Sequence, residues 1–110
     1  MSVSKQKGTA WETACVRWLQ SLGWQADRAP LRGTADQGDV TGLPGVVIEC
    51  KNAKTIKLSE WLGELENEIS NAHADTGVLL IKKRGKTDPG EAYAVMPARI
   101  WARLLKESDR

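Results

Sequence analysis

Residues 38–52 read Gly38-Asp39-Val40-Thr41-Gly42-Leu43-Pro44-Gly45-Val46-Val47-Ile48-Glu49-Cys50-Lys51-Asn52, and this stretch decides the fold. It contains two short apolar strands separated by a Pro-Gly turn, which predicts a β-hairpin. Glu49 and Lys51 are two positions apart in the second strand, and alternate residues of a strand point to the same face. We therefore expect a carboxylate and an ammonium group side by side, close to Asp39 if the register of the hairpin allows it.

The register of this hairpin decides whether the two carboxylates meet. Asp39 and Glu49 share a face only if the numbers of paired residues sum to an even value, as when Asp39 lies opposite Glu49. That pairing leaves a three-residue loop, Leu43-Pro44-Gly45, in which Gly45 takes a positive φ. A two-residue turn at Pro44-Gly45 would place the carboxylates on opposite faces, whereas a bulge or a longer loop would restore the even pairing. We expect the even register because the chemistry considered below requires it.

The segments around the hairpin predict an α/β fold in a single domain, residues 1–110, with a mixed central sheet flanked by helices. Apolar periodicity and turn residues predict the following elements in chain order: a flexible arm 1–6, helix 7–22, strand 24–28, loop 29–37, strands 38–41 and 46–51, helix 58–74, strand 77–82, edge strand 92–96 and helix 97–107. Strand 46–51, helix 58–74 and strand 77–82 form a βαβ unit, so those two strands are expected to be parallel. We expect this unit to bury Val46, Ile48 and Cys50.

The composition is that of a globular protein with no membrane segment. Of 110 residues, 41% are apolar and 27% are charged. No apolar run approaches the roughly 20 residues needed to span a bilayer, and the N-terminal residues have no signal-peptide pattern. Cys15 and Cys50 lie within apolar patterns, so we expect buried, reduced thiols and a cytoplasmic location. The tryptophans are expected in the core or in a dimer interface: Trp11, Trp18, Trp24, Trp61 and Trp101.

Charge is unevenly distributed along the chain, although the net charge is only +2. Residues 58–81 contain five acidic residues and no Lys or Arg, and the tight basic cluster Lys82-Lys83-Arg84-Gly85-Lys86 follows. This segregation favours one face for a phosphate backbone and another turned to solvent or to a partner.

The residue types of the hairpin suit a divalent-metal site that acts on phosphodiesters. Magnesium prefers oxygen ligands, which Asp39, Glu49 and the backbone carbonyl of Cys50 would provide. Lys51 would orient or deprotonate an attacking water, or offset negative charge in the transition state. The alternative reading of this pattern is an ordinary strand with a solvent-exposed face.

With these motifs in place, the chain from Lys7 to about Lys83 resembles the PD-(D/E)xK nuclease superfamily, and within it the archaeal-type Holliday junction resolvases. The matching parts are the opening of the first helix, the Arg-containing loop, the paired motifs and the helix and strand that follow: Lys7-Gly8-Thr9-Ala10-Trp11-Glu12, residues 29–37, Gly38-Asp39 and Glu49-Cys50-Lys51. The resemblance implies a restriction-endonuclease-like αβββαβ core. It implies that Asp39 and Glu49 are metal ligands, that Lys51 is the catalytic lysine, and that Glu12 supports the metal directly or through a water. Gly38 stands where the superfamily motif has proline.

The resemblance also implies an activity and its partners. We expect a Mg²⁺-dependent endonuclease, with Mn²⁺ able to substitute, that cuts branched DNA such as four-way junctions as a homodimer. The helix at 58–74 and the terminal helix with Trp101 are the candidate dimer interfaces. Candidate DNA contacts are Lys5, Lys7, Arg28, Arg32, Thr34, Lys54 and Lys57. The alternatives are a repair or restriction-type nickase, a DNA-binding module that does not cut, and an interaction domain that uses its acidic helix. A cellular enzyme and one encoded by a virus or mobile element fit equally well.

Overall fold

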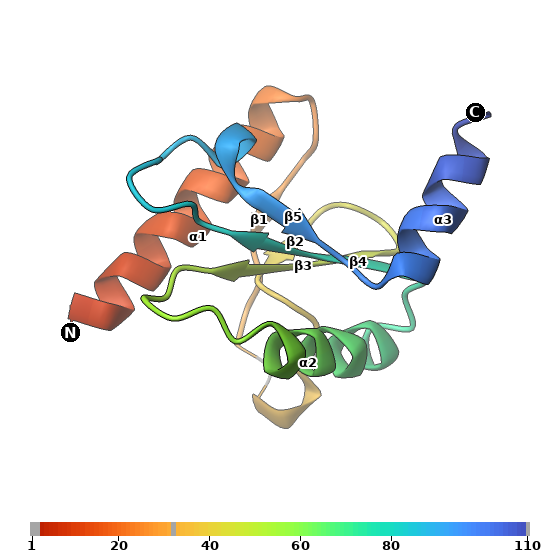
Figure 1. Ribbon diagram of the computed structural model, residues 1–110, viewed down its shortest axis with the longest axis horizontal. Helices are drawn as coiled ribbons and strands as arrows, with labels where there is room; N and C mark the ends of the chain where they lie inside the picture. Colours follow the sequence, from red (N-terminus) through yellow and green to blue (C-terminus); the bar gives the residue numbers. More distant parts are fainter. Residues whose placement is uncertain (1–2, 32, 110) are drawn as a thin grey trace.

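The computed structural model describes residues 3–31 and 33–109, which form one α/β unit built around a five-stranded mixed sheet (Figure 1). Its elements are α1 (Val3–Ser21), β1 (Asp27–Arg28), the 3₁₀ turn η1 (Gly33–Ala35), β2 (Val40–Thr41), β3 (Val46–Lys51), α2 (Leu58–Asn71), β4 (Thr76–Ile81), the 3₁₀ turn η2 (Pro89–Glu91), β5 (Tyr93–Val95) and α3 (Ala98–Glu107). The predicted α/β class, the mixed sheet and the order of its strands and helices are confirmed.

The strands lie in the order β1-β2-β3-β4-β5. The first three form an antiparallel meander, and β3 runs parallel to β4, with α2 as the crossover between them. β5 pairs antiparallel to β4 at the edge. This topology follows from the sequence, because parallel strands need a long connection and the amphipathic segment between β3 and β4 provides it.

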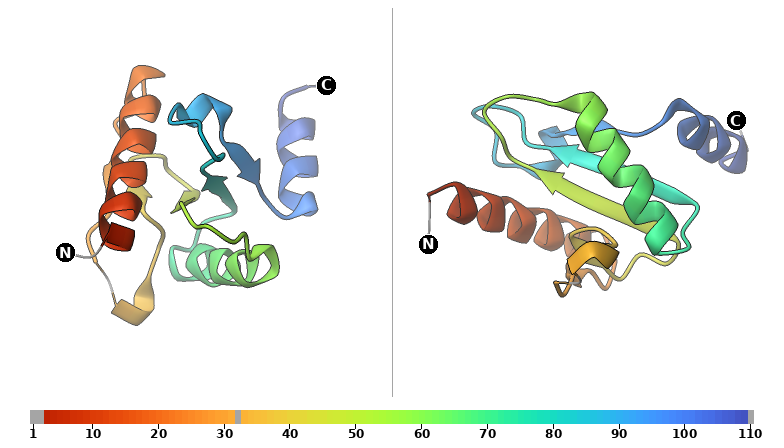
Figure 2. Two further views of the ribbon diagram at one scale, coloured as in Figure 1. Left: turned by 60° about the vertical axis from the view of Figure 1, so that its left-hand side comes forward. Right: turned by 90° about the horizontal axis from the view of Figure 1, so that it is seen from below.

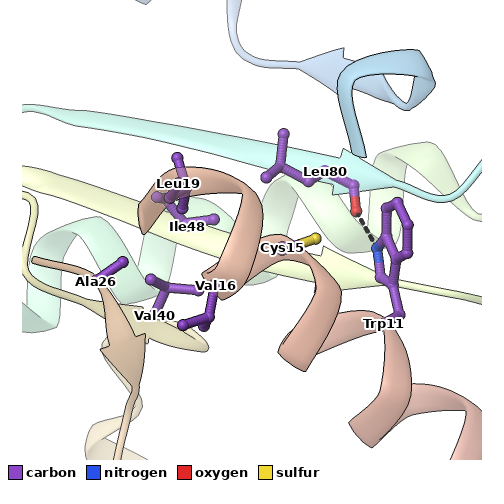
Figure 3. Packing of buried hydrophobic residues seen from close by; sticks show 8 residues of the cluster. All are labelled: Trp11, Cys15, Val16, Leu19, Ala26, Val40, Ile48 and Leu80. Carbon is purple, nitrogen blue, oxygen red and sulfur yellow. Dashed lines mark hydrogen bonds between the residues drawn. The ribbon is translucent and has the colours of Figure 1, made fainter. Parts of the chain in front are cut away.

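Helices α1 and α2 cover opposite faces of the sheet, as the two views of Figure 2 show. The α1 side is a cluster of buried apolar side chains drawn in Figure 3: Trp11, Cys15, Val16, Leu19, Ala26, Val40, Ile48 and Leu80. The indole Nε1 of Trp11 donates to the carbonyl of Leu80 at 3.0 Å and fixes the helix on the sheet. Val46, Ile48 and Cys50 do face a core that β4 helps to form, with Ile48 buried and the other two half-buried. The helix that covers them is α1 and not the crossover helix α2, since alternate residues of β3 point to opposite layers.

The face of β3 that carries Val47, Glu49 and Lys51 lies under α2. Its core combines residues of the sheet and of two helices: Val47, Trp61, Leu65, Ile69, Leu79, Ile81 and Ile100. Glu49 and Lys51 therefore lie next to α2.

Several boundaries differ from those predicted. The helix begins at Val3, so the expected flexible arm at 1–6 is helical over the residues that the structure describes. Its sequence has no proline or turn signal that would stop a helix before Lys7. The strand expected at 24–28 is reduced to Asp27–Arg28, because Gly23 takes a φ of +101° after α1 and Trp24 is 48% exposed.

The hairpin has the even register. Val40 pairs with Ile48, whose numbers sum to an even value, and the backbone N–H of Asp39 also donates to the carbonyl of Ile48, at 2.8 Å. A β-turn is nevertheless present at Pro44-Gly45, with Val46 N–H bonded to Leu43 C=O and Gly45 at φ +75°. The register is still even because two residues, Thr41 and Gly42, lie between the turn and the Val40–Ile48 pair on the β2 side, and only Val47 on the β3 side.

Gly42 has the backbone conformation that the additional residue on the β2 side of the hairpin requires. It adopts a φ of +101°, and a Cβ added there would lie 2.1 Å from the carbonyl oxygen of Gln25. Only glycine combines this backbone conformation with so close a contact.

The tryptophans divide into two groups. Trp11 and Trp61 are buried and Trp18 is half-buried, as predicted, whereas Trp24 and Trp101 are 48% and 58% exposed and lie outside the core. Their placement in a dimer interface stays a prediction. Within residues 3–31 and 33–109, no helix has the length and apolar character needed to cross a membrane.

Candidate metal centre

The central pair of the site is Asp39 and Glu49. Asp39 immediately precedes β2, and its Oδ2 accepts the backbone N–H of Cys50 at 2.7 Å. Glu49 projects from the middle of β3 and is only 6% exposed. The two carboxyl groups lie near enough for the charge of Glu49 to raise the pKa of Asp39. The even register is what brings them together.

The backbone of Cys50 completes this side of the site. Its N–H points toward Asp39, and in an antiparallel pair the N–H and C=O of one residue point to the same side of the strand. The Cys50 carbonyl therefore lies along the same edge as the Asp39 carboxylate. The thiol lies on the α1 face, where contact with Cys15 and burial raise its pKa. Both cysteines are free thiols packed in apolar surroundings, as expected.

Lys51 lies between Glu49 and α2. Its Nζ is 3.3 Å from Glu49 Oε2 and 2.9 Å from Glu64 Oε2, and it lies 5.5 Å from the centroid of the Trp61 ring. Burial alone would lower the pKa of Lys51, but its contacts with Glu64 and Glu49 outweigh this and raise it. The lysine is consequently an ammonium ion. Glu64 was not singled out from the sequence, although it lies on the helix of the predicted βαβ unit.

Glu12 reaches the pair from the opposite layer. It pairs with Arg28 Nη2 at 3.3 Å, and its pKa is raised by burial and by the negative charge of Asp39, which lies close to it. A residue of α1 can approach the site because Asp39 lies just before β2, next to β1, which carries the Arg28 that pairs with Glu12. Of the predicted set, Glu12 thus lies close to Asp39, Asp39 to Glu49, and Glu49 to Lys51.

The site gathers more negative charge than it neutralises. Burial, followed by the charge of Glu49, raises the pKa of Asp39 to about 7. Burial, followed by the charge of Glu68, raises the pKa of Glu49 to about 7. Oε1 of Glu49 is buried and has no hydrogen-bond partner among the residues that the structure describes. An all-oxygen set with an unsatisfied carboxylate oxygen fits a hard cation such as Mg²⁺.

Two further acids lie here that sequence reasoning missed. Asp36 and Glu68 each offer a carboxylate oxygen that lies, with one from Glu49, in a group whose members are all within 4.8 Å of one another. A signal for Glu68 existed in the sequence, because it falls three residues after Leu65 on the apolar stripe of α2. Asp36 belongs to a loop without periodicity, so no comparable signal marked it.

The predicted DNA contacts are scattered around this site. Lys7 lines a depression of about 340 Å³ together with Trp11, Asn52 and Lys82, and its carbonyl accepts a 3.5 Å hydrogen bond from Asn52 Nδ2. Lys5 is exposed on α1, and Lys54 and Lys57 are exposed between β3 and α2. Arg28 is paired with Glu12, while Arg32 lies outside the described residues and Thr34 is placed only by its backbone in η1.

Comparison of the chain with protein-family models, with curated proteins and with solved structures found no match. The chemistry of the site must therefore be argued from its own geometry. That geometry consists of a mostly buried group of carboxylates, one ammonium ion among them, and a backbone carbonyl directed to the same edge.

Proposed function

We propose that this chain is a Mg²⁺-dependent endonuclease with a restriction-endonuclease-like core, related to the PD-(D/E)xK nucleases that its motifs resemble, and that it cuts branched DNA. One observation carries the proposal. The even register at Val40–Ile48 brings the Asp39 carboxylate to the backbone N–H of Cys50, next to Glu49, and Lys51 lies two residues after Glu49 on the same face, 3.3 Å from it. The order of a helix, three strands, a helix and a strand is consistent with the proposed core.

Asp39, Glu49 and the Cys50 carbonyl would hold the cation, and Glu12 would support it directly or through a water. The unpartnered Oε1 of Glu49 and the raised pKa values of the acids support this, because a bound cation would remove their mutual repulsion. When bound, the cation would lower the pKa of a coordinated water and polarise a phosphoryl oxygen. Mn²⁺ is expected to substitute, since it shares the preference for oxygen ligands.

Lys51 acts in this proposal as a cation and not as a base. Its raised pKa, which results from Glu64 and Glu49 outweighing burial, keeps the ammonium form at neutral pH. An ammonium ion can stabilise the negative charge that develops on a phosphate and can donate a hydrogen bond to it. Of the roles considered from the sequence, charge stabilisation is therefore the one we propose.

Basic residues support DNA as the substrate. Lys54 and Lys57 follow β3, and Lys82 follows β4 at the same ends of these parallel strands, near Lys7. Positive charge collected at one edge of a sheet favours a phosphate backbone. Arg28 pairs with Glu12 through Nη2 and its side chain is half exposed, so it would position a site residue, and its contact with DNA stays a prediction.

A four-way junction needs two symmetric cuts, so we propose a homodimer with one site per protomer. The exposed Trp101 and Leu105 on α3 are the apolar residues that this interface would cover. A reducing, cytoplasmic compartment suits the two free thiols.

The test compares cleavage of labelled four-way junction, linear duplex and single-stranded DNA, with Mg²⁺ and with EDTA. The wild type is run beside Asp39→Asn and Lys51→Ala. Asp109→Asn and Lys106→Ala, both at exposed positions near the C-terminus, are the matched controls for charge. Sedimentation velocity on the same samples measures the oligomeric state.

Paired, metal-dependent nicks in the junction that disappear in Asp39→Asn and Lys51→Ala, and persist in both controls, would support the proposal. Tight junction binding without cleavage under Mg²⁺ or Mn²⁺ would refute the enzymatic activity and favour a DNA-binding module. Equal cleavage of linear duplex would refute junction specificity and favour a nickase. Glu12→Gln is expected to raise the Mg²⁺ concentration needed for half-maximal rate, and an unchanged requirement would return Glu12 to an ordinary surface role.

A further inference from the structure

The inner face of α2 carries a carboxylate where a helix normally presents an apolar side chain to a sheet. Glu68 is 5% exposed and lies on the stripe that Leu65 and Ile69 also occupy. Its Oε1 is buried and accepts no hydrogen bond within residues 3–31 and 33–109. A carboxylate in this position is unfavourable unless something compensates its charge.

Acidic groups surround Glu68, and Lys51 also lies near enough for its charge to act on it. Carboxylate oxygens of Asp36 and Glu49 lie with one of Glu68 within 4.8 Å of one another, and Oε1 of Glu49 is also buried without a partner. Lys51, the cation nearest to this group that we identify, contacts Glu49 and Glu64. Three carboxylates therefore lie close together, and two of them have a buried oxygen without a hydrogen-bond partner.

Asp36 is held in place by its own contacts. Its Oδ1 accepts the backbone N–H of Gly38 at 2.9 Å, and its carbonyl accepts Nδ2 of Asn71 at 2.9 Å. Asn71 is the last residue of α2, so the segment after η1 is tied to the helix that carries Glu68, as the position of η1 beside α2 in Figures 1 and 2 illustrates.

We propose that Asp36, Glu49 and Glu68 form a second site for a hard divalent cation, separate from the one at Asp39 and the Cys50 carbonyl. The spacing suits one ion, because oxygens on opposite sides of a cation are about 4.2 Å apart for Mg²⁺ and about 4.8 Å apart for Ca²⁺. Three carboxylates give the charge and the oxygen donors that such ions select. The inference rests on the proposed nuclease function only in that both sites use Glu49.

Because both sites use Glu49, the second cation would lie close enough to the first to act on the same phosphodiester. Two cations beside one carboxylate can stabilise both the attacking and the leaving oxygen of a phosphodiester, which a single cation cannot do. The second cation would also neutralise Glu68, whose burial beneath α2 otherwise has no function in the proposed reaction.

The experiment counts bound ions without using activity. The metal-free protein is titrated with Mn²⁺ at pH 8 in the absence of DNA, and free Mn²⁺ is measured by its EPR signal. We expect two bound ions per chain for the wild type and one for Glu68→Gln. Asp36→Asn should also bind one, and its Asn oxygen can keep the bond to Gly38 N–H, so this exposed substitution leaves the fold intact. Glu60→Gln, an equal charge change on the exposed face of α2, should bind two.

The outcomes separate the second site from the proposed function. If Glu68→Gln and Asp36→Asn both bind as many Mn²⁺ ions per chain as the wild type, the second site is overturned, even if the chain cuts junctions. Two ions that fall to one in these variants would support it, even if no DNA is cut and the nuclease proposal fails. A single ion lost in Glu68→Gln but kept in Asp39→Asn would support the Asp36, Glu49 and Glu68 site and contradict the one at Asp39.

Discussion

Replacing Gly38 with alanine is expected to destabilise the fold, because the site is built against its bare backbone. Gly38 has a φ of +98°, and an added Cβ would lie 2.9 Å from both the carbonyl oxygen of Ile48 and Cγ1 of Val47. The left-handed conformation alone costs about 1–2 kcal/mol for an L-residue. Crowding a packed interior adds about 1–3 kcal/mol. The sum of about 2–5 kcal/mol is a large part of the roughly 5–15 kcal/mol that stabilises a small domain.

Gly23 provides the matched control. Its φ of +101° is nearly the same, but no atom lies within 4 Å of an added Cβ, so Gly23→Ala should show only the conformational part, about 1–2 kcal/mol. Urea unfolding followed by tryptophan fluorescence measures both variants. If Gly38→Ala and Gly23→Ala differ by less than about 0.5 kcal/mol, the contact with the Ile48 backbone is not real, and the register argument loses its support.

Gly38→Pro extends this test to the motif. Proline fixes φ near −65°, which is incompatible with the +98° observed, so this variant should be less stable than Gly38→Ala. The proline of the superfamily motif therefore cannot stand at this position in this chain without a change in the path of the backbone.

Three further outcomes follow from the site and from the packing of α1. The pKa values of Asp39 and Glu49 are raised to about 7 and that of Glu68 to about 8, so between pH 4 and 8 the folded chain holds protons that the unfolded chain has released. Stability in EDTA should therefore fall as pH rises from 5 to 8, and a melting temperature that stays constant or rises would contradict the buried carboxyls. Adding Mg²⁺ should raise the melting temperature at pH 8 and have little effect at pH 5, whereas equal shifts at both pH values would indicate binding elsewhere. Trp11→Phe should cost about 1–3 kcal/mol by removing the buried hydrogen bond to Leu80 and part of a packed indole, whereas Trp101→Phe at an exposed position should stay within about 0.5 kcal/mol.

The hairpin shows what local sequence can decide. The period of two along a strand is sufficient to place Glu49 beside Lys51, and the structure has them 3.3 Å apart. The register was not decidable in the same way, because Pro44-Gly45 by itself favours a two-residue turn. The extra residue depends on Gly42 lying against the carbonyl of Gln25, a contact between segments that no local pattern describes.

Local sequence did not decide which helix covers which face of β3. Periodicity identified the apolar residues of β3 correctly but gave no information on which helix covers which face. Both faces of β3 are covered, by α1 against Ile48 and by α2 against Val47, so the strand reads as an almost continuous apolar run. The opposite assignment, in which α2 covers Ile48, hid the fact that Glu49 and Lys51 would face the acidic helix. Glu68 was overlooked for that reason.

The placement of the carboxylates implies that a cation would connect separate layers of the fold. Glu12 comes from α1, Asp39 from the start of β2, Glu49 from β3 and Glu68 from α2. Asp39 lies close to Glu12 and to Glu49, and Glu49 lies close to Glu68. Without a cation the ionised acids repel one another, and this repulsion, together with burial, raises the pKa values of Asp39, Glu49 and Glu68. Binding should therefore stabilise the whole unit and not only a loop, since an ion that binds only the folded state contributes its full binding free energy to folding. Amide hydrogen exchange of the metal-free and the Mg²⁺-loaded protein distinguishes stabilisation of the whole unit from stabilisation of one loop. Protection should rise together in α1, β3 and α2, and a rise confined to the segment before β2 would refute the coupling.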